Sequence, residues 1–273
     1  MEGLGYEERS VAGGGLTYAQ ASSAPLTGFI FALPLFIVYH AGLWWLSTFA
    51  GLKWANAIDI AIAEGLGRLG MAGPLLSFIL VVIVFLSMHA MSGKPWYWPK
   101  LTTWIGMIME SLVMALPVFV LSQLVGHLLT YLPLSAVDGI IDGDISWKAS
   151  LILSCGAGVY EEFFFRILVM GLLALLFGKV MGIRSGTKYV LAVILQALLF
   201  AASHHLPGGP EQVTNIVEAR AVLPVFTFRA VAGIYFAILY LERGFGVAAG
   251  AHAGYDLMVV LLEVLTPVDH MAG

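Results

Sequence analysis

Two adjacent glutamates and an arginine lie inside an apolar stretch that is long enough to cross a membrane. They are Glu161, Glu162 and Arg166, in the order Glu-Glu-Phe-Phe-Phe-Arg. Ionised side chains are costly at bilayer depth, so they are retained there mainly where they pair with one another or perform chemistry. Further polar residues follow in later apolar stretches: His204, His252 and Asp256. Acid, base and imidazole groups inside membrane helices indicate a candidate for intramembrane catalysis.

Helical spacing separates the two glutamates. Residues four apart project from nearly the same face, so Glu162 and Arg166 are predicted to form an ion pair. Glu161 is rotated by about 100° from Glu162 and needs another partner. The alternative for Glu162 and Arg166 is a buried charge cluster that only fixes helix packing. For Glu161 a functional role is the favoured interpretation.

The histidines have structural and catalytic interpretations. A lone histidine in a membrane helix, such as His204, often only makes a hydrogen bond to a neighbouring helix. His252 and Asp256 are four apart and share a helix face, and the small residues of 244–250 before them permit close approach of another helix. The structural alternative is an Asp–His hydrogen bond that stabilises packing, with Arg229 as counter-charge.

These groups must be positioned by membrane-spanning helices. The chain is 60% hydrophobic and 11% charged, with a mean hydropathy of +0.92, which lies far outside the usage of soluble domains. The sequence predicts an all-α, polytopic membrane helix bundle with seven or eight transmembrane helices. A segment at 52–70 is predicted to be an amphipathic helix on the membrane surface or the eighth span. The seven apolar spans lie at roughly 26–48, 73–93, 103–131, 149–177, 189–206, 222–241 and 245–265.

Three short motifs resemble those of the CPBP family of intramembrane proteases, which includes type II CAAX prenyl endopeptidases and bacteriocin-processing or immunity proteins. They are Glu-Glu-x-x-x-Arg from Glu161 to Arg166, Phe-x-x-x-His from Phe200 to His204, and His-x-x-x-Asn, with His252 first and Asp256 in the last place. The motif core spans about 149–260. On this basis residues 26–265 are predicted to form one transmembrane protease-like domain, after a flexible N-terminal segment (1–25) and before a C-terminal tail (266–273).

The resemblance implies a catalytic cavity inside the bilayer. Glu161 and His204 would hold and activate a water molecule, and His252 with Asp256 would stabilise the oxyanion. Glu162, Arg166 and Phe200 would support them. The implied substrate is a membrane-associated protein or peptide, with no metal or other cofactor, and the implied location is a bacterial inner (plasma) membrane. The net charge of −4 and the lack of a basic run argue against nucleic-acid binding, and the sequence indicates no oligomeric state.

The aspartate at position 256 departs from the family motif. An asparagine amide donates to an oxyanion, whereas an ionised aspartate repels it. Asp256 must therefore be protonated, hold His252 as a cation, or have a different role. The favoured hypothesis is an Asp–His⁺ pair in which His252 is the donor to the oxyanion.

Two alternative functions use the same sequence features. Glu161, His204 and His252 have the chemistry of zinc ligands, although the sequence lacks a His-Glu-x-x-His helix. A non-catalytic immunity protein, scaffold or transporter is the second alternative, in which Glu110 and Arg229 would line an ion or proton pathway. The simpler interpretation of these two residues is buried structural polarity.

Overall fold

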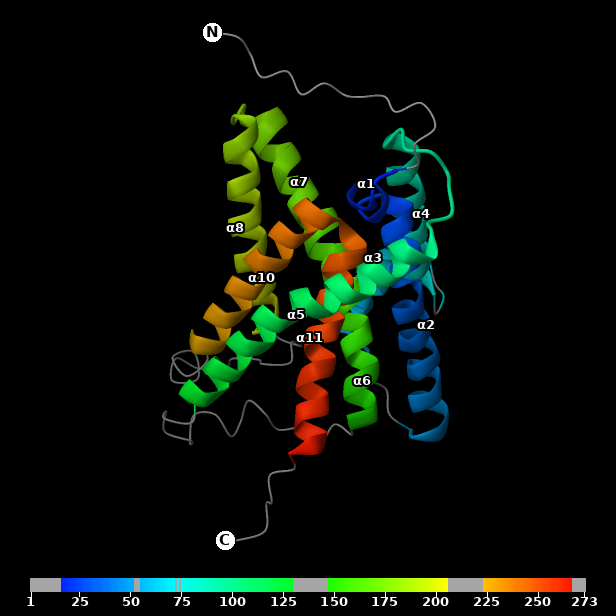
Figure 1. Cartoon of the computed structure of the whole chain (residues 1–273), viewed down its shortest axis with the longest axis vertical. Coiled ribbons are helices and arrows are strands. Elements are labelled where there is room, and N and C mark those ends of the chain that lie inside the picture. Colours follow the sequence, from blue (N-terminus) through cyan, green and yellow to red (C-terminus); the bar gives the residue numbers. More distant parts are fainter. Residues whose placement is uncertain are drawn as a thin grey trace, which may run out of the picture.

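The computed structural model describes residues 16–51, 55–71, 73, 75–129, 147–205 and 223–266. Every regular element in these residues is a helix, and the helices assemble into one bundle (Figure 1). Large apolar side chains such as Leu172 and Val190 remain exposed on its outer faces, as expected for a surface that faces lipid rather than water. The prediction of an all-α membrane helix bundle is confirmed.

Six helices in the described residues are long and apolar enough to cross a membrane. The predicted span at 73–93 corresponds to α4 (Leu76–Met91), which has 16 residues, slightly fewer than a spanning helix usually needs. The total of seven or eight spans stays a prediction. The six long helices are α2 (Pro25–Phe49), α5 (Leu101–Leu129), the continuous helix from Trp147 to Val180, α8 (Ser185–Ser203), α10 (Leu223–Arg243) and α11 (Phe245–Leu265).

The continuous helix changes its winding where the two glutamates lie. It comprises α6 (Trp147–Gly156), η2 (Ala157–Glu161), η3 (Phe163–Val169), α7 (Met170–Leu175) and η4 (Leu176–Val180), of which the η segments are π-helical. Glu161 is the last residue of η2, and Glu162 links η2 to η3. Such wider turns occur frequently at functional sites because they re-aim side chains within a helix.

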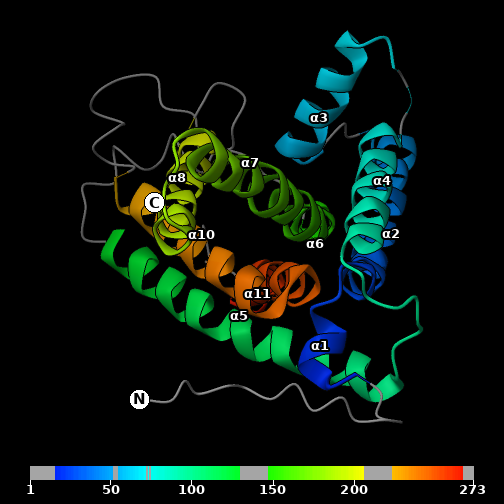
Figure 2. The ribbon, with the colours of Figure 1, turned by 90° about the horizontal axis from the view of Figure 1, so that it is seen from above.

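Helix α11 lies at the centre of the bundle, between α5, α10 and α6 (Figure 2). Small residues allow this close packing. A Cβ atom added to Gly28 of α2 would lie 2.9 Å from the backbone nitrogen of Gly246, and one added to Gly158 of η2 would lie 2.6 Å from Cβ of Ala253. The close approach predicted from the small residues of 244–250 is therefore present.

A single residue joins α10 to α11. Helix α10 ends at Arg243 and α11 begins at Phe245, with Gly244 between them at φ 83°. Glycine adopts this left-handed conformation without the steric cost that a side chain would add. The tight turn fixes α10 and α11 as adjacent helices.

The segment predicted at 52–70 forms the short helix α3 (Ala57–Arg68), which packs against α4 and η2. Its 12 residues extend for about 18 Å, compared with a hydrocarbon core of about 30 Å, so the described helix is shorter than a span. A second short helix, α1 (Tyr18–Ser22), packs against α5. Most of the predicted N-terminal segment (residues 1–15) and of the predicted tail (267–273) lies outside the described residues.

Candidate active site

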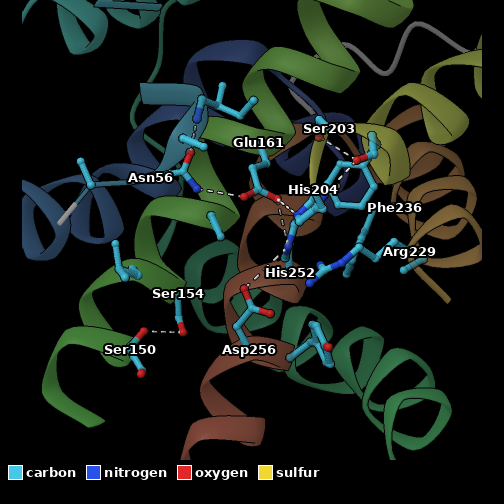
Figure 3. A pocket seen from close by; sticks show the side chains of 18 of the residues that line it. Asn56, Ser150, Ser154, Glu161, Ser203, His204, Arg229, Phe236, His252 and Asp256 are labelled. Atoms are coloured by element: carbon cyan, nitrogen blue, oxygen red, sulfur yellow. Dashed lines mark hydrogen bonds and ion pairs between the residues drawn. The ribbon is translucent and has the colours of Figure 1, made fainter. Parts of the chain in front are cut away.

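Six helical segments surround a cavity of about 610 Å³. The residues that line it come from α3, α6, η2, α8, α10 and α11, and Asn56, His204 and His252 point toward Glu161 (Figure 3). The cavity brings together all four predicted catalytic residues: Glu161, His204, His252 and Asp256. The three motifs, which are distant in sequence, therefore share one site.

The two oxygens of the Glu161 carboxylate have different surroundings. Oε1 accepts a hydrogen bond of 2.9 Å from Nδ2 of Asn56. Oε2 lies 3.9 Å from Nε2 of His204 and 3.9 Å from Nε2 of His252. These two separations exceed direct hydrogen-bond distance, and at such separations a water molecule can bridge polar groups.

His204 follows the last residue of α8 and is buried. Its Nδ1 lies 2.9 Å from the carbonyl oxygen of Phe200. Because a carbonyl only accepts, Nδ1 carries the hydrogen and Nε2 of the neutral ring is an acceptor. The Phe200 ring meets the imidazole edge-on, with centroids 4.9 Å apart. Phe200 therefore orients Nε2 of His204 toward Glu161.

Three carboxylates surround His252. Oε1 of Glu162 lies 2.8 Å from Nδ1 of His252, and Oδ2 of Asp256 lies 3.7 Å from Nε2. Oε2 of Glu161 lies 3.9 Å from the same Nε2. Phe236 of α10 covers one face of the imidazole, with the centroids 4.7 Å apart and the rings nearly parallel at 7°. The ring is thus fixed in orientation, and its Nε2 faces the cavity.

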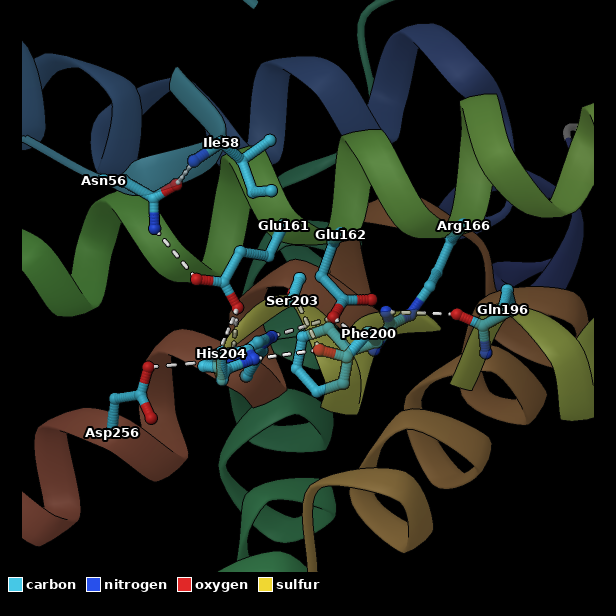
Figure 4. A network of polar contacts seen from close by, with 11 residues as sticks. Asn56, Ile58, Glu161, Glu162, Arg166, Gln196, Phe200, Ser203, His204 and Asp256 are labelled. Carbon is cyan, nitrogen blue, oxygen red and sulfur yellow. Dashed lines mark hydrogen bonds and ion pairs between the residues drawn. The ribbon is translucent and has the colours of Figure 1, made fainter. Parts of the chain in front are cut away.

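The predicted ion pair between Glu162 and Arg166 is present, and it is fully buried. Oε1 of Glu162 lies 2.9 Å from Nη2 of Arg166 (Figure 4). The same oxygen also lies 2.8 Å from Nδ1 of His252. Nη1 of Arg166 donates to Oε1 of Gln196, and the guanidinium lies over the Phe200 ring, 4.8 Å from its centroid. This network anchors His252 from behind the cavity.

Asp256 and Arg229 lie on the cavity wall, whereas Glu110 does not line the cavity. Glu110 of α5 instead pairs with the Arg243 guanidinium, and its Oε2 accepts a hydrogen bond of 2.6 Å from the hydroxyl of Tyr18. The interpretation of Glu110 as structural polarity agrees with these contacts.

A zinc site would need ligands that share one centre about 2.0–2.2 Å away. Among the described residues, no group of three His, Cys, Asp or Glu side chains is arranged so that it could hold a metal ion. Glu161 and the two imidazoles converge with the spacing of groups that share a water molecule. The absence of a metal cofactor stays a prediction.

Sequence reasoning missed several contacts that shape the site. Asn56 precedes α3 and lies outside the motifs, Phe236 belongs to α10, and the pair formed by Glu162 and His252 joins residues 90 positions apart. Asn56 carried one usable signal, because an asparagine directly before a helical segment is a common N-cap. Its contact with Glu161 depends on tertiary packing and left no trace in local spacing.

Residues 144–258 match the family model described as type II CAAX prenyl endopeptidase Rce1-like. The matched range begins just before α6 and includes all three motifs, whereas α1 to α5 lie before it. No curated protein and no solved structure matches the chain. The resemblance drawn from the motifs is confirmed over the matched range: residues 144–258 of this multi-pass membrane chain are similar to type II CAAX prenyl endopeptidases.

Proposed function

We propose that the chain is an intramembrane endopeptidase that hydrolyses a peptide bond with a water molecule activated by Glu161 and His204. The observation that carries this proposal is the position of Oε2 of Glu161, which faces the cavity 3.9 Å from the Nε2 atoms of both histidines. A water molecule between these atoms contacts a carboxylate and an imidazole acceptor at once.

The first step needs a base and an orienting acceptor. Glu161 takes a proton from the water through Oε2, while Nε2 of His204 accepts the second hydrogen and directs a lone pair toward the scissile carbonyl carbon. The C–O bond forms as the carbonyl electrons move onto oxygen. General-base catalysis of this kind contributes about 10²–10⁴-fold to rates, and two features of the site support it: the burial of Glu161 and the fixed orientation of His204.

The developing oxyanion needs a donor, which we assign to Nε2–H of His252. Three carboxylates around one imidazole favour its cationic form by charge attraction. Glu162 holds Nδ1, and Asp256 lies near Nε2, which supports the hypothesis of an Asp–His⁺ pair. One oxyanion donor is commonly worth about 3 kcal/mol in the transition state.

Collapse of the tetrahedral intermediate completes the reaction. Glu161 returns its proton to the amide nitrogen, the C–N bond breaks, and the products are a carboxylic acid and an amine. The site needs no covalent enzyme intermediate, because the attacking oxygen comes from water.

The substrate is proposed to be a membrane-associated protein or peptide, and the location a bacterial inner membrane. The apolar outer faces and the position of the polar groups within spanning helices support a substrate that enters from the bilayer or its surface.

The test is cleavage of a peptide library in detergent by the wild type, Glu161→Ala and His204→Ala, each with and without a chelator. We expect cleavage by the wild type, loss in both variants and no effect of the chelator. Chelator-sensitive cleavage would favour the zinc alternative. Absence of cleavage by folded wild type across lipidated and unlipidated libraries would favour a non-catalytic role.

A further inference from the structure

Asn56 makes a direct contact with the proposed base, although it lies outside the residues matched by the family model. It is buried, it lines the cavity and it is the N-cap of α3. We propose that Asn56 is a positioning residue, which fixes the Glu161 carboxylate so that Oε2 faces the two imidazoles.

The orientation of the Asn56 amide is determined by its two partners. Oδ1 accepts a hydrogen bond of 2.9 Å from the backbone nitrogen of Ile58, and Nδ2 donates to Oε1 of Glu161. The backbone nitrogen only donates, and the carboxylate accepts. A flipped amide would lose both hydrogen bonds, so one orientation satisfies both partners.

The backbone of Asn56 is held as firmly as its side chain. Its N–H donates to the hydroxyl of Tyr39, which itself donates to Oδ2 of Asp59, and both hydrogen bonds are 2.9 Å long. Asp59 also accepts a hydrogen bond from Ser77 of α4. Helices α2, α3 and α4 thus converge on Asn56 through buried polar contacts.

Glu161 needs such a partner because of its own torsional freedom. The terminal torsion of a glutamate is broad, so packing of the aliphatic part does not fix the plane of the carboxylate. The hydrogen bond to Oε1 fixes that plane and leaves Oε2 directed at the gap between His204 and His252. Helix α3 therefore contributes to the site through Glu161.

Two substitutions separate this role from helix capping. Serine and aspartate cap helices about as well as asparagine, so Asn56→Ser and Asn56→Asp both keep α3 capped. Serine is too short to reach Glu161 as well, and aspartate places a second negative charge against it. We expect kcat to fall about tenfold in Asn56→Ser and further in Asn56→Asp, with little change in KM or in the melting temperature.

The matched control is Thr17→Asp. Thr17 caps α1 through its side chain, so this variant keeps a cap and adds the same charge at a residue that does not line the cavity. Its kcat should equal that of the wild type. Equal kcat values for the wild type, Asn56→Ser and Asn56→Asp would show that Asn56 serves only as a cap and would overturn the inference.

The expected change in kcat rests on the proposed function, whereas the hydrogen bond between Asn56 and Glu161 does not. Infrared spectroscopy detects this hydrogen bond without substrate. The difference spectrum of wild type minus Glu161→Gln isolates the carboxyl band of Glu161. The same difference in the Asn56→Ser background should show that band at a shifted frequency, and an unshifted band would overturn the inference. If Glu161→Gln still cleaves peptides, the proposed function fails, and the band position still decides the role of Asn56.

Discussion

Glu110 and Glu161 are both carboxylates inside membrane-spanning helices, but they stand in two differently built regions. Where α5 meets α10 and α1, Glu110 contacts its partners directly: Arg243 and Tyr18 bind its oxygens. At the cavity, Oε1 of Glu161 accepts a hydrogen bond from Asn56, and Oε2 lies 3.9 Å from two imidazoles. A charge whose partners are all in contact stabilises the fold, whereas a charge with one oxygen facing a cavity is available for chemistry.

The largest expected effect distinguishes these two glutamates. Glu161→Gln should lower kcat by about 10²–10⁴-fold with little change in melting temperature, because an amide still accepts from Asn56. Glu110→Gln should lower the free energy of unfolding by about 2 kcal/mol, because the arginine loses its charged partner, and should leave kcat nearly unchanged. Peptide cleavage and thermal unfolding in the same detergent measure both. A stable Glu110→Gln protein without activity would contradict the comparison and favour a proton pathway through Glu110.

An intermediate effect is expected at Asp256, which lies on the cavity side of His252. Asp256→Asn should retain cleavage within about tenfold of the wild type, because Glu162 still holds Nδ1 of the imidazole at 2.8 Å. The substitution also restores the asparagine of the family motif. Steady-state kinetics on the best peptide of the library provide the measurement. Complete loss of turnover in a folded Asp256→Asn protein would rule out the Asp–His⁺ hypothesis.

The smallest effect concerns Tyr18 in the Glu110 region. Burial, followed by the hydrogen bond and charge of Glu110, raises the pKa of Tyr18 to about 12, compared with about 10 in an unfolded chain. The protonated phenol therefore contributes stability that is fully present below pH 10 and is lost as the pH rises toward 12.

Tyr18→Phe lacks this titration. Its melting temperature should lie about 2 °C below that of the wild type at pH 9, and the difference should shrink between pH 10 and 12. Thermal unfolding at several pH values measures this difference in melting temperature. The effects of other titrating groups cancel in the difference because both proteins contain them. A gap that stays constant over this range would show that the hydroxyl of Tyr18 adds no pH-dependent stability.

Local spacing predicted the parts of the site that lie within one helix. The pair formed by Glu162 and Arg166 follows from a separation of four residues, and so does the shared face of His252 and Asp256. Hydropathy likewise predicted the six long spans, because each one is a single apolar run.

Contacts between distant helices were beyond the reach of local spacing. Asn56 meets Glu161 across 105 positions, and only the packing of α3 against η2 brings them together. The turn of π-helix at Glu161 also has no signal in the hydrophobic pattern, since the apolar run continues through it. The order of the motifs indicated which residues belong together, whereas tertiary packing determined which atom faces which.

The length of the one-residue turn between α10 and α11 determines how Phe236 and His252 of the candidate site lie relative to each other. Phe236 lies eight residues before Gly244 and His252 eight residues after it, so both rings are about 12 Å along their helices from the turn. This equal count explains why the rings stack. One residue inserted at Gly244 would lengthen the turn that holds Phe236 and His252 at the same depth. Surface loops usually tolerate such insertions, but this connection sets the register of the imidazole.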